Sequence, residues 1–181
     1  GPAADDDMKG GRQANRQAFP AFHNAPVGAF GALDARLLIV GLAPGLKGAN
    51  RTGRPFTGDY AGDLLYATLV AHGFATGTFG RRADDGLNLV DCRVTNAVRC
   101  VPPGNKPTGQ EIATCRGYLR AEIAAMPRLR VMLALGRIAH RSVLAALGAM
   151  QTAWPFRHGA LHRLPDGPIL ADSYHCSRYN T

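Results

Sequence analysis

Several absences narrow the classes of protein to which this sequence can belong. None of its apolar runs approaches the ~20 residues that cross a bilayer, and its N-terminus lacks the pattern of a secretion signal. We therefore expect no membrane partner and a cytoplasmic location. Internal repeats and low-complexity tracts are also missing. With 181 residues, of which 46% are hydrophobic, the chain is suited to one domain with a real core.

Cysteine is scarce and shows no disulfide-scaffold pattern. The four cysteines are Cys92, Cys100, Cys115 and Cys176. In a chain without a secretion signal, such cysteines are reduced thiols or metal ligands.

Acidic residues are outnumbered, which gives a formal net charge of +8, and Arg far outnumbers Lys. Guanidinium groups bind phosphate oxygens in pairs, so an Arg-rich surface suits a polyanion. Many basic proteins never contact nucleic acid, so the charge alone does not decide the partner.

Short apolar strands alternate with helical segments along the chain. We expect strands at 37–40, 87–91, 93–95, 130–135 and 168–173, and helices at 12–22, from Asp59 to about 72, at 108–125 and at 138–147. This order predicts an α/β fold, a three-layer α/β/α sandwich with a mostly parallel central sheet. Residues 1–24 form an N-terminal segment, of which the first seven are a cloning remnant or a frayed tail, and 25–181 form a single domain.

Polar residues follow three of these strands. A long loop follows Val40, Asn96 follows the strand at 93–95, and His175 follows the strand at 168–173. Ligands of such sheets bind outside the carboxyl ends of the strands. The sequence therefore predicts a site where these three ends meet.

The loop from Gly41 to Asp59 is long for a compact domain, which is typical of a functional segment. It has neither the Gly-Lys-Ser/Thr of a P-loop nor dinucleotide-binding glycine spacing, which argues against an unrelated nucleotide-binding protein. Phe56 could stack on a base or simply anchor the loop. Asp59 could orient a water molecule or cap the following helix, and the two roles are compatible.

Asn96 and His175 each allow two interpretations. The Asn96 amide offers the donor and acceptor that the edge of uracil requires, but Asn is also common in turns at strand ends. His175 could donate a hydrogen bond to a developing anion, or belong to an ordinary polar tail. Taken one at a time, the structural roles are the commoner ones.

Four motifs occur together in a fixed order: 41–45 (GLAPG), 50–59 (NRTGRPFTGD), 95–100 (TNAVRC) and 174–177 (YHCS). In this order they closely resemble the uracil-DNA glycosylase superfamily, and most of all its fifth family, the type B enzymes of prokaryotes. The resemblance extends from about Ala25 to Thr181. The ten-residue run at 50–59 is long, and is therefore more specific than any single short motif.

The resemblance implies a monofunctional DNA repair enzyme that flips uracil or another deaminated base out of DNA and hydrolyses its glycosidic bond. It implies that Asp59 handles the water, in a family where the position of Leu42 is not polar, and that His175 stabilises the leaving base. The implied base-binding residues are Gly41, Ala43, Pro44, Phe56 and Asn96. The implied DNA-binding residues are Arg51, Arg54, Ser177, Arg178 and Asn180.

Relatives in the fourth and fifth families carry a 4Fe-4S cluster held by four cysteines. Cys100 and Cys115 match two of these ligands, whereas no cysteine precedes Cys92 to supply the N-terminal pair. The resemblance therefore implies a 4Fe-4S cluster in the natural protein and leaves open whether the chain as given holds one. Family members also continue past the position of Thr181, so the resemblance implies that both ends of this sequence are shortened. No nucleotide cofactor is expected.

The implied partner is uracil-containing DNA, with a monomeric enzyme associated with the nucleoid of a prokaryote. An alternative is a catalytically weak module of the same fold that holds uracil or DNA without cutting. Asp59, placed to handle water, argues against that alternative.

Overall fold

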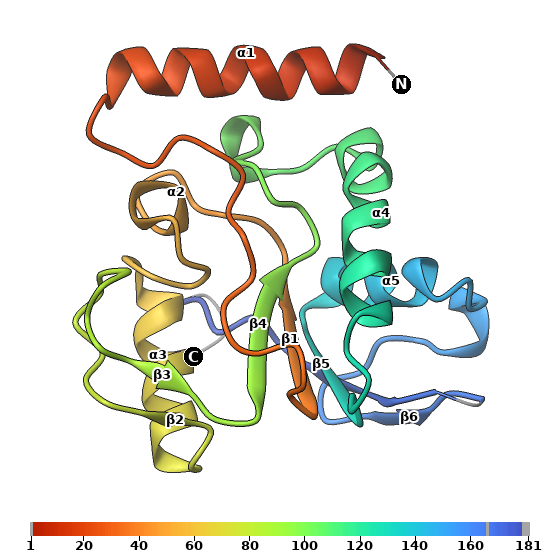
Figure 1. The fold of residues 1–181 in the computed structure, drawn as a ribbon. Helices are drawn as coiled ribbons and strands as arrows, with labels where there is room; N and C mark the ends of the chain where they lie inside the picture. The colour runs from red at the N-terminus through yellow and green to blue at the C-terminus, as the bar shows by residue number, and fades with distance from the viewer. Residues whose placement is uncertain (1, 166, 179–181) are drawn as a thin grey trace.

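A parallel sheet forms the centre of the protein in the computed structural model, which describes residues 2–165 and 167–178 (Figure 1). The strand order is β4-β1-β5-β7-β6. β1 (Leu37–Gly41) pairs in parallel with β4 (Cys92–Asn96) and β5 (Val131–Leu135), and β5 pairs in parallel with β7 (Ile169–Ser173). In the described residues, no helix is both long and apolar enough to span a membrane.

Helices cover both faces of this sheet. Leu38 and Val40 of β1 face one core, which includes residues of α4 (Gly109–Ala124) and α5 (Arg137–Ala146). Ile39 faces the other core, with residues of α3 (Tyr60–Ala71). Neighbouring residues of a strand point to opposite faces, so a β1 that is apolar on both faces is buried on both. The predicted three-layer α/β/α sandwich is confirmed.

Local capping signals place two of the helices. The Asp59 side chain accepts a hydrogen bond from the Gly62 amide at the start of α3. Thr108 and Glu111 form a complete capping box at the start of α4, because each side chain bonds the other residue's backbone amide. Both helices therefore begin where the sequence predicts.

The structure departs from the predicted strands in two places. The segment expected to be a strand at 87–91 contributes only β3 (Asn88–Leu89), which pairs antiparallel with β2 (Ala75–Thr76) in a separate small sheet. The sheet also has an edge strand that was not predicted, β6 (Leu161–Arg163), which runs antiparallel to β7. A three-residue strand at the edge lacks the apolar run by which the central strands were recognised.

The N-terminal helix is longer than predicted. α1 covers Pro2–Ala18 rather than 12–22, and it contacts α4 along the top of the molecule in Figure 1. A short helix, α2 (Ala49–Thr52), lies inside the long loop after β1, and 3-10 turns cover Pro103–Asn105 and Gln151–Ala153. Residues 2–7, which we expected to be a cloning remnant or a frayed tail, belong to α1.

Candidate active site

The site begins where β1 and β4 end side by side. Gly41 and Asn96 are partners in the parallel register, so their strands finish at the same edge of the sheet. Beyond the strands, the Ala97 amide donates to the Gly41 carbonyl oxygen at 2.9 Å, and the Val98 amide donates to that of Leu42 at 2.9 Å. These bonds hold the two loops next to each other.

Gly41 makes room for the groups above it. A Cβ at this position would lie 2.4 Å from Asn96 Oδ1 and 2.4 Å from Phe56 Cζ. Neither distance is possible for packed atoms, so glycine permits the close approach of this amide and this ring to the strand. Gly41 therefore lies directly below Asn96 and Phe56, and it is not among the residues that line the pocket.

A buried cation organises the loop that carries Phe56. The Arg54 guanidinium donates to both carboxylate oxygens of Asp85, at 2.9 and 2.7 Å, and its Nε donates to Thr57 Oγ1 at 2.9 Å. The group also lies over the rings of Phe30, Tyr66 and Phe79, 4.9–5.8 Å from their centroids.

Arg54 is only 4% exposed. The expectation that it binds DNA is therefore wrong, because its donors are already used inside the protein. Hydrogen bonding by Arg54 lowers the pKa of the Asp85 carboxyl, so this buried pair stays charged and holds the loop.

Phe56 adopts an unusual backbone conformation, with a φ of 52°. The helix start fixes it there, because Gly62 packs so closely below the Phe56 carbonyl that any Cβ would overlap it. Next to it, the Tyr66 hydroxyl donates to the Pro55 carbonyl oxygen at 2.6 Å. The Phe56 ring then lies 5.9 Å from the His175 ring, with 29° between their planes.

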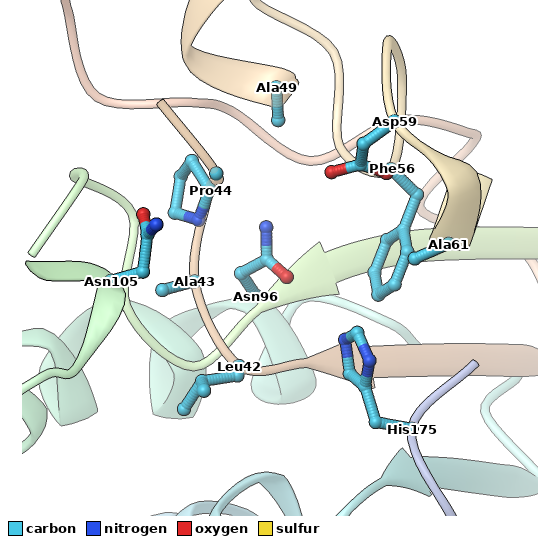
Figure 2. Close-up of a pocket in the computed structure, with 11 residues that line it drawn as sticks. Leu42, Ala43, Pro44, Ala49, Phe56, Asp59, Ala61, Asn96, Asn105 and His175 are labelled. Atoms are coloured by element: carbon cyan, nitrogen blue, oxygen red, sulfur yellow. The ribbon is translucent and has the colours of Figure 1, made fainter. Parts of the chain in front are cut away.

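A small pocket opens between these side chains, with a volume of about 190 Å³. This is below the 300–1,000 Å³ of pockets for larger ligands and suits one small planar molecule. Figure 2 shows the Asp59 carboxylate, the Asn96 amide and the His175 ring around the same space. The pocket is lined by Leu42, Ala43, Pro44, Gly45, Ala49, Phe56, Asp59, Ala61, Asn96, Asn105 and His175.

The two carboxylate oxygens of Asp59 have different surroundings. Oδ1 accepts the Gly62 amide at 3.2 Å and caps α3. Oδ2 points to the opposite loop, where a Cβ on Gly48 would lie 2.4 Å away and one on Gly45 would lie 3.4 Å away. The residue as a whole is exposed. Its second oxygen therefore lies beside the loop at 45–48, and Asp59 is one of the residues that line the pocket.

His175 approaches the pocket from the segment after β7. Burial lowers its pKa below the usual value, while the negative charge of Asp59 acts in the opposite direction. The lowered pKa favours a neutral imidazole, which can donate one hydrogen bond to an acceptor in the pocket.

The structure brings together six of the seven residues predicted to be catalytic or base-binding. Asp59, His175, Ala43, Pro44, Phe56 and Asn96 all line one pocket. Arg51 and Arg178 are exposed, and the Arg178 guanidinium lies 5.1 Å from the centroid of the Tyr60 ring, next to Asp59. Ser177 is half-buried, and Asn180 lies outside the described residues.

Sequence reasoning missed Asn105 as a lining residue. It sits at the end of a 3-10 turn with a φ of 58°, in the loop between β4 and α4. An Asn that follows Pro-Pro-Gly is an ordinary turn signal, so nothing local distinguishes it. The chain reversal after β4 is what returns this residue to the pocket.

The cysteines do not fit the 4Fe-4S cluster that the resemblance implies. Cys100 and Cys115 line a common cavity with Arg12, whose Nη1 donates to Cys100 Sγ at 3.2 Å. Cys92 is the first residue of β4 and is buried in the core on the α3 side of the sheet, and Cys176 Sγ donates to the Ala61 carbonyl oxygen. Within the described residues, only two thiols and one cation meet at the expected place.

Comparison with known proteins agrees with this geometry. The sequence model of a protein family, the uracil DNA glycosylase superfamily, matches residues 28–181. The chain belongs to this superfamily. A type-5 uracil-DNA glycosylase of Thermus thermophilus is 49% identical over 156 residues, which cover 86% of this chain and 71% of that protein.

Further relatives separate two families within the superfamily. A type-5 uracil-DNA glycosylase of Pyrobaculum aerophilum is 40% identical over 88% of this chain and 69% of its own length. A type-4 uracil-DNA glycosylase of Thermotoga maritima is 37% identical, but over only 60% of this chain and 49% of its own length. The prediction that the chain most resembles the fifth family is confirmed.

Proposed function

We propose that this chain removes uracil from DNA by hydrolysing the bond between the base and its sugar. The observation that carries the proposal is one small pocket in which an aromatic ring, an amide, a carboxylate and a neutral imidazole face each other. Membership of the uracil DNA glycosylase superfamily supports the same activity. A base that is stacked in a duplex cannot enter such a pocket, so the nucleotide must rotate out of the helix.

Phe56 and Asn96 hold the base. Phe56 offers an aromatic face on which a flipped pyrimidine stacks. The Asn96 side chain is buried and faces the pocket, so its amide pairs with the donor and acceptor edge of uracil. The amino group of cytosine presents a different edge and leaves the amide wrongly paired.

His175 and Asp59 stabilise the separating charges. As the C1′–N1 bond breaks, its electron pair moves onto the base, where neutral His175 donates a hydrogen bond to the developing anion. The sugar becomes positive and faces the Asp59 carboxylate. A water molecule held by Asp59 adds to C1′ and gives a proton to the Asp59 carboxylate, which leaves an abasic sugar. The uracil anion takes up a proton as it is released, so one water is consumed in total.

The proposed reaction uses a water nucleophile, because no lysine stands at these motif positions to form a covalent imine. It uses no nucleotide cofactor, and no step involves an iron–sulfur group. The exposed Arg51 and Arg178, together with Ser177, lie near the pocket mouth and are suited to bind DNA phosphates. We propose a monomeric enzyme that acts at the nucleoid of a prokaryotic cell.

The first test is uracil release from an oligonucleotide with one uracil, measured beside an oligonucleotide with hypoxanthine or xanthine, whose edges share acceptors with that of uracil. We expect uracil release with many turnovers and no strand cleavage before alkali treatment. Binding without release would instead favour a module that holds uracil without cutting.

Asn96→Asp tests base selection at constant size. The change removes the amide donors, so we expect the ratio of kcat/KM for uracil over cytosine to fall by at least tenfold, or release of both bases to be lost. Circular dichroism controls for folding, because Asn96 is buried. An unchanged ratio would contradict the role of Asn96.

A further inference from the structure

A second group of polar side chains lies away from the base pocket. His140 comes from α5, His162 from β6 and Asp172 from β7, and their possible ligand atoms all lie within 4.8 Å of one another. His140 Nδ1 is 2.6 Å from Asp172 Oδ1, and His162 Nε2 is 2.8 Å from Asp172 Oδ2. The three side chains are only 1%, 11% and 0% exposed. None of them lines the pocket around Phe56.

When His140 is neutral, hydrogen bonds alone do not satisfy both of its ring nitrogens. Both ring nitrogens of His140 face acceptors, namely Asp172 Oδ1 and, at 2.8 Å, the Trp154 carbonyl oxygen. A neutral imidazole has one N–H, so one nitrogen lone pair is left facing an oxygen. A cation bound between the rings and the carboxylate would use that lone pair.

We propose that His140, His162 and Asp172 form a binding site for a divalent metal ion of the zinc class. Two imidazole nitrogens and one carboxylate oxygen are ligands that Zn²⁺ takes, with water as the fourth. Nδ1 of His140 binds the ion, and its Nε2–H then donates to the Trp154 carbonyl oxygen. A ligating histidine is commonly oriented by such a bond from its other nitrogen to a backbone carbonyl.

The surroundings hold the carboxylate in place for this role. The Arg157 amide donates to Asp172 Oδ2 at 3.1 Å, which leaves lone pairs on both oxygens for further ligands. The His162 ring is fixed edge-on against Trp154, with centroids 6.0 Å apart. The site therefore joins a helix, two strands and the loop at 154–157.

A bound ion would stabilise the segment that delivers His175. Asp172 lies three residues before His175, at the end of β7. In the same loop as Arg157, His158 accepts a hydrogen bond from the Tyr174 amide at 3.1 Å and stacks on the Tyr174 ring at 4.5 Å. The ion is assigned a structural role at this edge of the sheet, separate from the hydrolytic step.

The test uses the full chain, freed of metal by a chelator and then titrated with Zn²⁺ or Co²⁺. We expect one ion per chain by elemental analysis, a rise in Tm, and the visible absorption of Co²⁺ in a four-coordinate nitrogen and oxygen site. His162→Phe keeps a ring against Trp154 but removes a ligand nitrogen, so it should lose stoichiometric binding. His72→Ala, which changes an exposed histidine, should bind as the parent does.

Two outcomes would overturn the proposal. The first is the absence of stoichiometric metal in a folded parent chain, which would leave a hydrogen-bonded network with a doubly protonated His140. The second is retention of the ion by both His162→Phe and Asp172→Asn, or an intense cobalt–thiolate band, which would place the ion on cysteines. Uracil release is measured in parallel, and its failure would not affect the metal result.

Discussion

At the residue scale, Asp59 uses one oxygen to cap α3 and presents the other to the pocket. An alanine substitution would remove both functions together, and the loss of activity could then be ascribed to the helix. Asparagine caps a helix about as well as aspartate but carries no charge. Asp59→Asn therefore separates capping from catalysis.

For Asp59→Asn we expect uracil release to slow by roughly 100-fold or more, as for a lost general base. The free energy of unfolding should stay within about 0.5 kcal/mol of the parent, because the cap is kept. Single-turnover assays and urea denaturation measure the two quantities. Thr108→Ala is the control, since it removes the cap of α4 at a cost of about 1 kcal/mol without slowing release. Release within a few-fold of the parent would exclude Asp59 from the hydrolytic step.

The same variant has a second measurable effect, on His175. The Asp59 charge raises the pKa of His175 while burial lowers it, so Asp59→Asn should lower this pKa further, as followed by NMR titration. Because the folded-state pKa lies below the unfolded value, the unfolded chain takes up this proton first as pH falls. The contribution of His175 to stability is therefore present above the unfolded pKa, near 6.5, and is lost on acidification below it.

At the element scale, the loop between β1 and α3 depends on an ion pair between two residues that are far apart in the sequence. Arg54 and Asp85 are 31 residues apart, and both side chains are almost fully buried. Removing one partner of a buried pair leaves an uncompensated charge, which typically costs about 3–5 kcal/mol.

Asp85→Asn should therefore lower the free energy of unfolding by about this amount. It should also impair the positioning of Phe56, which follows Arg54 in the same loop. Asp84→Asn is the matched control. Its carboxylate pairs with Arg82 at the surface, where both side chains are at least 70% exposed, and we expect no change in Tm. Thermal unfolding compares the stability of the two variants. Equal stability would show that the buried pair does not hold the loop.

Local chemistry made some elements predictable. The caps at Asp59 and Thr108 lie within three residues of their partners, so the starts of α3 and α4 could be read from the sequence. The edge strand β6 could not, because its three residues are exposed or half-buried and form no apolar run, and it pairs with one neighbour only. The predicted N-terminal helix began too late because the first seven residues look like a cloning remnant or a frayed tail and were left out of the fold.

Part of the candidate site was also predictable from the local sequence. Asn96 and His175 follow buried strands, and parallel strands end at one edge of a sheet. Arg54 appeared to be a DNA contact because its guanidinium stands in a basic, polar motif, while its partner Asp85 and the three rings around it come from other parts of the fold. Asn105 likewise reaches the pocket only through the path of the chain after β4.

At the scale of the whole molecule, the N-terminal helix packs against the middle of the chain. α1 contacts α4, and Arg12 donates to Cys100 Sγ in a cavity that Cys115 also lines (Figure 1). In the described residues only the thiols of Cys100 and Cys115 meet there, whereas a 4Fe-4S cluster takes four cysteine ligands.

We therefore expect this chain, prepared without oxygen and supplied with iron and sulfide, to remain colourless and to contain no iron and sulfide in the proportions of a 4Fe-4S cluster. Uracil release should be the same with and without iron, because Cys100 and Cys115 do not line the base pocket. The double variant Cys100→Ser, Cys115→Ser should keep that activity, while Arg12→Met should loosen α1 and increase its hydrogen exchange. Stoichiometric iron that disappears in the double variant would contradict this view and show that ligands other than these two thiols complete a cluster.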